Sequence, residues 1–114
     1  PKEVEYLEQF VFVKSDKILH RVDFQTIIYV QAEGDFVRVI TTETKHFLSN
    51  TLKYWTSILP ERHFLQVHRS YLINISKIES IRGNEIITKA GKVPVGRSFK
   101  NKLLETIEKI GSQN

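Results

Sequence analysis

The chain has 114 residues, enough for one domain with its own core and too few for two. A hydrophobic fraction of 40% and a charged fraction of 26% are typical of globular proteins and argue against disorder. The absence of cysteine excludes disulfides and thiolate metal sites, and it is compatible with a reducing cytoplasm. The formal net charge of +4 fits a polyanionic partner without requiring one.

The start of the chain has none of the features of an exported or membrane-inserted protein. Residues 1–8 are acidic and polar, so we expect a linker or N-terminal arm there, a domain over residues 9–111 and a C-terminal tail over 112–114. The arm lacks the basic-then-apolar order of a signal peptide, and no apolar run approaches the ~20 residues of a membrane helix. Pro1 in place of a methionine suggests a fragment. We therefore expect a cytoplasmic protein that does not contact membranes and has an upstream domain.

The first third of the domain has the patterns of short strands. Residues 10–22 contain two β-rich stretches around positions 15–17, which predicts a hairpin. Asp23 is expected to cap a single turn. The β-branched and aromatic stretch at 27–32 predicts a largely buried strand, and the alternation at 36–42 predicts another.

A helix is predicted near the middle of the chain. Asn50 is a suitable N-cap, and Pro60 ends the pattern. The residues between them form an apolar stripe at helical spacing, made of Leu52, Trp55, Ile58 and Leu59.

The second half of the chain predicts further strands and a last helix. The isoleucines of residues 75–81 recur at every third position, which fits neither template cleanly, whereas Gly83 marks a hairpin turn before strands within 85–95. A helix is expected with Ser98 as its cap and Gly111 at its end. Strands that do not alternate with helices predict a mainly β fold of small antiparallel sheets, with one mid-chain and one C-terminal helix.

Residues 67–74, VHRSYLIN, place three polar side chains inside an apolar run. Burying His68, Arg69 and Ser70 would be costly, yet a surface loop would make poor use of the apolar residues around them. The order arginine, serine, aromatic recurs at 97–99. We interpret each aromatic residue as a core anchor and each polar group as displayed at the surface.

Catalytic patterns are weak. No two of the four histidines have the helical spacing of a zinc enzyme, and no serine lies in a nucleophile elbow, so we expect no metal, no cofactor and no enzymatic activity. A phosphodiesterase built from His68, Arg69 and Lys100 is chemically conceivable and stays an alternative.

Cations and small polar groups gather at three element boundaries: residues 33–38, 68–70 and 96–102. Each arginine of the repeated pattern could donate two hydrogen bonds to guanine in a major groove. The short polar side chains could donate to phosphates, and a helix N-terminus at the third boundary favours an anion. Asp35 could accept from a cytosine amino group, although phosphates would repel its carboxylate.

The segments IIYVQAEGDFVRVITT, FLQVHRSYLIN with the isoleucines at 78 and 81, and PVGRS resemble the LytTR DNA-binding domain of bacterial response regulators, the LytR/AlgR family. The resemblance runs from about Phe10 to Ile110. It implies antiparallel sheets whose loops enter the major groove, and sequence-specific binding to double-stranded DNA. It also implies an output domain of a two-component regulator of transcription, behind an N-terminal receiver domain. Paired direct repeats and a possible homodimer on DNA belong to the same expectation.

The resemblance also assigns roles to individual residues. Arg69 and Arg97 fall at base-reading positions, and the turn at 34–38, with Asp35 and Val37, falls where a further loop enters the groove. The residues expected near phosphates are His68, Ser70, Ser98, Lys100, Asn101 and Arg38.

Two features keep other readings open. The turn reads Gly-Asp-Phe-Val where Gly-Asn-Tyr-Val is common in the family, which puts base reading by Asp35 in question. An RNA-binding β module would stack bases on exposed aromatics, of which Phe36 is the one near the basic loops. A protein-interaction domain with a basic face is the other alternative.

Overall fold

The computed structural model describes residues 9–111, so the predicted arm at 1–8 and tail at 112–114 lie outside the described residues. The strands are β1 (Phe10–Ser15), β2 (Ile18–Asp23), β3 (Ile27–Glu33), β4 (Phe36–Thr41), β5 (Lys45–Leu48), β6 (Phe64–His68), β7 (Tyr71–Asn74), β8 (Ser80–Arg82), β9 (Glu85–Thr88) and β10 (Gly91–Pro94). The helices are α2 (Leu52–Ile58) and α3 (Lys100–Gly111), with 3-10 turns η1 (Phe24–Thr26), η2 (Ile75–Lys77) and η3 (Arg97–Phe99). The prediction of a mainly β chain with a mid-chain and a C-terminal helix is confirmed.

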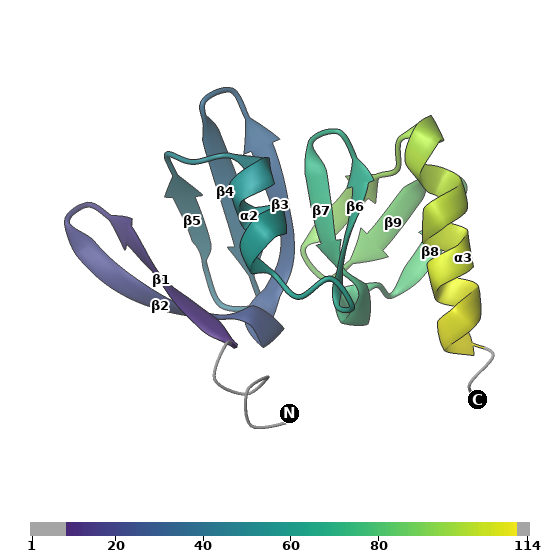
Figure 1. The fold of residues 1–114 in the computed structure, drawn as a ribbon, viewed down its shortest axis with the longest axis horizontal. Coiled ribbons are helices and arrows are strands. Elements are labelled where there is room, and N and C mark those ends of the chain that lie inside the picture. The colour runs from purple at the N-terminus through teal and green to yellow at the C-terminus, as the bar shows by residue number, and fades with distance from the viewer. Residues whose placement is uncertain (1–8, 112–114) are drawn as a thin grey trace.

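The strands form separate antiparallel sheets, as predicted. The central sheet has five strands in the order β5-β4-β3-β7-β6, with a two-stranded hairpin β1-β2 on one side and a three-stranded sheet β10-β9-β8 on the other. Figure 1 shows this row, from the hairpin through the central sheet to α3. The isoleucine-rich segment that fitted neither template contains η2 and the start of β8.

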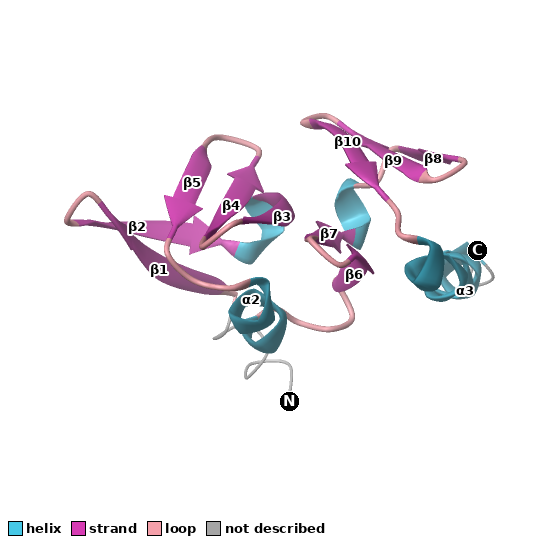
Figure 2. Cartoon of the chain, turned by 90° about the horizontal axis from the view of Figure 1, so that it is seen from above, coloured by secondary structure: helices cyan, strands magenta, loops and turns pink. Residues whose placement is uncertain are grey.

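The central sheet is apolar on both faces because each face is covered. Successive side chains of a strand point to opposite sides, so Val39 of β4 enters one core and Ile40 enters the other. The first core lies under α2 and is built around Trp55, whose side chain is 0% exposed. The second is closed by β9, β10 and Leu103 of α3. Figure 2 shows α2 and the three-stranded sheet on opposite sides of the central sheet.

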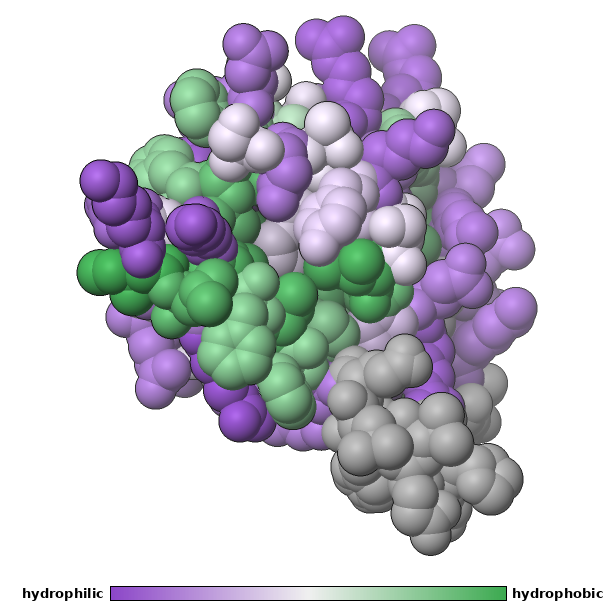
Figure 3. Space-filling view, turned by 60° about the vertical axis from the view of Figure 1, so that its left-hand side comes forward, coloured by the Kyte–Doolittle hydropathy of each residue, from purple (hydrophilic) through white to green (hydrophobic). Residues whose placement is uncertain are grey.

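The β1–β2 hairpin forms as the sequence predicted. Its turn residues Asp16 and Lys17 have φ values of 52° and 67°, and positive φ at both central residues is characteristic of a two-residue hairpin turn of type I′. Val13 points into the first core, whereas Phe12 and Leu19 are 56% and 65% exposed. Figure 3 shows hydrophobic side chains gathered on this side of the molecule.

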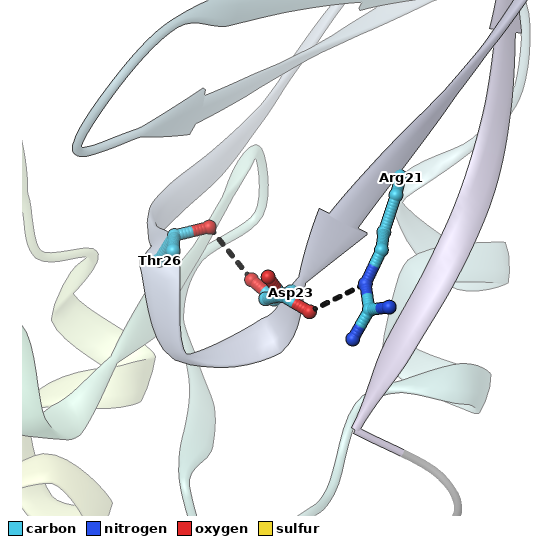
Figure 4. Close-up of polar contacts among 3 residues, drawn as sticks. All are labelled: Arg21, Asp23 and Thr26. Atoms are coloured by element: carbon cyan, nitrogen blue, oxygen red, sulfur yellow. Dashed lines mark hydrogen bonds and ion pairs between the residues drawn. The ribbon is translucent and has the colours of Figure 1, made fainter.

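At the corner after β2, Asp23 makes a different contact from the predicted cap. Its side chain does not cap η1; one carboxylate oxygen accepts from Arg21 Nε at 3.0 Å. The hydroxyl of Thr26 donates to the backbone oxygen of Asp23 at 2.7 Å (Figure 4). The turn itself was predicted correctly, but a local side-chain ion pair replaced the cap.

The cap of α2 was predicted one residue too early. Thr51 is the N-cap, and its hydroxyl accepts from the backbone N–H of Tyr54 at 3.1 Å. The amide oxygen of Asn50 instead accepts from the indole N–H of Trp55 at 2.9 Å, which satisfies the polar atom of a buried ring. The helix ends at Ile58, before the predicted stop at Pro60.

The start of the last helix also differs from the prediction. Ser98 is not a cap: it lies inside the 3-10 turn η3, whose N-cap is Gly96, and α3 follows from Lys100. Within α3 only Leu103 is fully buried, and Ile110 is exposed. Within residues 9–111, no helix has the length and apolar character needed to cross a membrane.

Candidate nucleic-acid interface

The turn between β6 and β7 carries the exposed Arg69, and side chains of β6 hydrogen-bond to the backbone of this turn. His68 and Tyr71 pair across the hairpin, leaving Arg69 and Ser70 as the turn residues. The Ser70 N–H donates to Nδ1 of His68 at 3.1 Å. The amide nitrogen of Gln66 donates to the backbone oxygens of His68 at 3.2 Å and Arg69 at 3.4 Å. The turn therefore has several hydrogen bonds besides those of the ladder.

A β-bulge just before this turn joins it to the segment that carries Arg97. Gln66 opposes Leu72 and His68 opposes Tyr71, so Val67 is the extra residue on β6. Val67 is 0% exposed, and its carbonyl accepts from the Gly96 N–H at 2.8 Å. The two Arg-Ser-aromatic stretches are thereby placed side by side.

Gly96 packs closely against the Phe99 ring. A Cβ atom added to Gly96 would lie 3.6 Å from Cα of His68 and 3.0 Å from Cδ2 of Phe99. The second distance is tighter than ordinary van der Waals contact, so a side chain at Gly96 would require the Phe99 ring to shift by a few tenths of an ångström. Phe99 contacts Gly96 but is only half-buried and belongs to neither core, so the prediction that it anchors the core is wrong, and Arg97 next to Gly96 is exposed.

The β3–β4 turn lies beside the same edge of the central sheet. The Ala32 N–H at the end of β3 donates to the backbone oxygen of Ser70 at 2.8 Å, which aligns the two turns. Gly34 has a φ of 61°, a conformation that glycine adopts without strain, and Asp35 completes the exposed turn. Figure 1 shows this turn, the β6–β7 turn and the start of α3 along the upper edge of the molecule.

Arg69 and Arg97 are both exposed, and within residues 9–111 neither guanidinium has a hydrogen bond or an ion pair. Two other exposed cations have intramolecular partners instead. Arg21 contacts Asp23, and Lys92 lies 3.9 Å from Glu85. The two predicted base readers therefore lie on neighbouring backbone segments, and their guanidinium groups have no intramolecular partner within residues 9–111.

The prediction that Val37 reads a base is wrong. Its side chain is 0% exposed and belongs to the first core, so it cannot touch a base edge. The alternation of β4 explains why: the exposed turn ends at Phe36, and the next side chain points inward. Phe36 itself is 52% exposed at the end of the turn.

Arg38 lies on the sheet, not in the turn, and it has partners there. Its guanidinium donates to the Gln31 side-chain oxygen at 3.2 Å, lies 3.9 Å from a carboxylate oxygen of Glu33 and stands 5.4 Å from the centre of the Phe47 ring. Its buried Nε atom has no partner among the described residues. These contacts fix Arg38 to its neighbouring strands, which does not favour the predicted phosphate contact.

Lys100 is also engaged within the molecule. Its ammonium group donates to the backbone oxygen of Gly83 and, at 3.0 Å, to the side-chain oxygen of Asn84. It therefore ties the start of α3 to the β8–β9 turn. Ser98 and Asn101 are exposed on either side of it and stay candidates for phosphate contacts.

The rings under the Arg69 turn are packed against one another. His68 and Tyr71 have ring centroids 5.5 Å apart at 82°, and Tyr71 lies 5.8 Å from Tyr29. Burial raises the pKa of Tyr71, with Tyr29 contributing in the same direction, so its phenol stays protonated at neutral pH. Since Nδ1 of His68 accepts a hydrogen bond, its proton lies on Nε2 in this arrangement.

Gln66 is the residue that sequence reasoning missed. Its amide reaches two carbonyls of the turn that follows it, and only the folded hairpin brings these groups together. The sequence carried no signal of the bulge, because Leu65, Gln66, Val67 and His68 alternate between apolar and polar as in a regular strand.

Comparisons with known proteins agree with this architecture. The family model of the LytTr DNA-binding domain matches residues 17–108. The sensory transduction protein LytT of Bacillus subtilis is 33% identical over 88 residues, covering 72% of this chain and 36% of LytT. The transcriptional regulatory protein LytR of Staphylococcus aureus is 29% identical over 98 residues, covering 81% of this chain and 40% of LytR.

A solved structure has the same fold. A LytTr DNA-binding domain from Bacillus cereus superimposes with a TM-score of 0.78 at 22% identity, covering 87% of this chain and 96% of that one. The chain spans 36% to 40% of the length of the curated relatives named above. Given the match of the family model over most of its length, the chain belongs to the LytTR family of DNA-binding domains.

Proposed function

We propose that this domain binds double-stranded DNA sequence-specifically through the loop edge, defined as residues 34–36, 68–70 and 96–99. The observation that carries the proposal is that Arg69 and Arg97 lie on neighbouring backbone segments. Both are exposed and uncommitted within residues 9–111, on segments joined by the bond from Gly96 to the Val67 carbonyl. Arginine donating two hydrogen bonds to guanine is the commonest specific contact in a major groove.

The other polar groups of the loop edge would set register on the backbone. Ser70, Ser98 and the Nε2 proton of His68, together with Asn101 at the start of α3, would donate to phosphates without reading sequence. Asp35 would accept from a cytosine amino group, or only shape its turn. Binding of this kind releases counterions, so affinity should fall steeply with salt for all sequences.

The setting in a longer protein is part of the proposal. The relatives LytT and LytR are more than twice as long as their matched segments, and their names describe signal transduction and transcription regulation. We infer a cytoplasmic output domain, controlled by an N-terminal receiver and acting through binding without catalysis. It would recognise paired direct repeats, with two copies side by side on DNA.

Selection from a random pool of duplexes, at near-physiological salt, tests the proposal. We expect enrichment of a G-containing motif, with two similar half-sites if copies pair on DNA. A pool with no enrichment would contradict sequence-specific binding. Displacement of the duplex by single-stranded RNA would instead favour an RNA module that uses the exposed Phe36 ring.

A further inference from the structure

We infer that Gln66 and His68 are positioning residues that fix the direction of Arg69, and that Gln66 thereby determines sequence specificity without touching DNA. The inference rests on the proposed function, because it takes Arg69 as a base reader. It starts from a physical difficulty. A long arginine side chain on a two-residue turn loses much rotamer freedom on binding, and a mobile backbone beneath it would add to that cost.

The structure supplies a support for that backbone. The Gln66 amide spans the carbonyls of His68 and Arg69, so one side chain holds both peptide units that flank the Arg69 Cα atom. The Ser70 N–H is held from the other side by Nδ1 of His68. The backbone on each side of Arg69 is therefore hydrogen-bonded by a side chain of the preceding strand.

The bulge makes this arrangement possible. With Val67 as an extra residue, His68 moves opposite Tyr71 and its ring packs edge-on against that ring. The buried Val67 anchors the strand below, and its carbonyl holds Gly96. Bulges next to functional sites commonly re-aim a side chain, and here the re-aimed group is a histidine that accepts from the turn.

Gln66→Met is the direct test, because methionine keeps the length of the side chain, adds no charge and lacks the donor. The readout is the ratio of binding to the selected duplex over a random duplex. We expect this ratio to fall roughly three- to tenfold, as for the loss of one or two hydrogen bonds. Gln25→Met, on the exposed turn at the far end of the sheet, is the matched control and should leave the ratio unchanged.

A double-mutant cycle separates positioning from general damage. In an Arg69→Ala background the same Gln66→Met change should have no further effect on the ratio, because the side chain it positions is gone. An equal fall in both backgrounds, or no fall with wild-type Arg69, would overturn the inference.

His68 is tested by rescue. His68→Leu removes the acceptor for Ser70 and should lower the ratio, whereas His68→Asn supplies an oxygen near the place of Nδ1 and should restore most of it. Equal ratios for the two variants would remove His68 from the positioning set.

A measurement without DNA keeps this inference separate from the proposed function. Amide hydrogen exchange at Ser70 should speed up in His68→Leu and at neighbouring turn amides in Gln66→Met, with unchanged rates in α2. Unchanged exchange in both variants would overturn the support of the turn, even if the domain selects DNA. Faster exchange in a domain that shows no duplex selection would overturn the specificity role and the proposed function, and leave only the support of the turn.

Discussion

Arg69 of the loop edge and Arg21 of the β1–β2 hairpin are both exposed, and they differ in their partners. Arg21 on the hairpin lies 4.0 Å from the centre of the Phe10 ring and donates a hydrogen bond to the Asp23 carboxylate, so its guanidinium has partners within the hairpin. Arg69 on the loop edge has a fixed backbone and, within residues 9–111, an unpaired head group. The difference teaches that positive charge alone does not mark a binding site.

Removing the free arginines should have the largest effect. Arg69→Ala or Arg97→Ala should each weaken binding to the selected duplex by ~1–3 kcal/mol and relax preference at one base pair. Thermal unfolding should hardly change, because both side chains are exposed. Competition titrations with single-base variants of the duplex measure the effect. A variant that binds selected and random duplexes in the wild-type ratio would show that its arginine does not read a base.

Gly96→Ala should have an intermediate effect. Its φ of −73° suits alanine, so the consequence comes from the new Cβ atom 3.0 Å from the Phe99 ring. We expect a stability loss of ~1 kcal/mol by overpacking, with a smaller fall in duplex selectivity than Arg97→Ala causes. Gly111→Ala, with nothing within 4 Å of the added atom, is the control. Wild-type stability and selectivity in Gly96→Ala would show that the close approach is unimportant.

The hairpin arginine should matter little. Arg21→Ala removes an ion pair whose side chains are 56% and 50% exposed, which corresponds to roughly 0–1 kcal/mol of folding stability. It removes the same charge as Arg69→Ala but should leave duplex selectivity unchanged. Chemical denaturation and the duplex titration together measure both quantities. A loss of selectivity as large as for Arg69 would erase the contrast between the two regions.

A pH effect is expected at the junction of the hairpin with the central sheet. Burial lowers the pKa of His46 from its ordinary 6.5, and the facing His20 ring, 5.4 Å away, lowers it further. Because the pKa of His46 is lower in the folded state than in the unfolded state, protonation of His46 favours unfolding. The contribution of neutral His46 to the free energy of unfolding is therefore fully present above about pH 6.5, and it is lost as pH falls through the folded-state pKa. Denaturation across this range should show the loss, and His46→Leu should flatten it. An unchanged slope in that variant would assign the pH effect elsewhere.

The sequence predicted most of the fold because the signals were local. The β-branched and aromatic composition of 27–32 located β3, the alternation at 36–42 located β4, and the polar break at 15–17 located the turn of the first hairpin, whereas β6 and β7 were not assigned as strands. The errors were also local. Asn50 and Ser98 are both residues that favour caps. The side chain of Asn50 instead accepts a hydrogen bond from the Trp55 indole, and Ser98 lies inside a 3-10 turn.

The candidate site was predictable only in part. Arg69 and Arg97 could be found from a repeated motif, whereas Val37 was misassigned because a turn boundary one residue away decides which way it points. The partners of Arg38 and the support by Gln66 depend on neighbours across strands. No pattern along the chain specifies which cation will find a partner after folding.

Titration of the domain with its selected duplex, followed by backbone amide NMR signals, tests the central claim most directly. We predict that the largest shifts map to residues 34–36, 68–70 and 96–99, with little change in β1 and β2. Shifts concentrated on the hairpin or along α3, with those three segments unaffected, would contradict recognition by the loop edge.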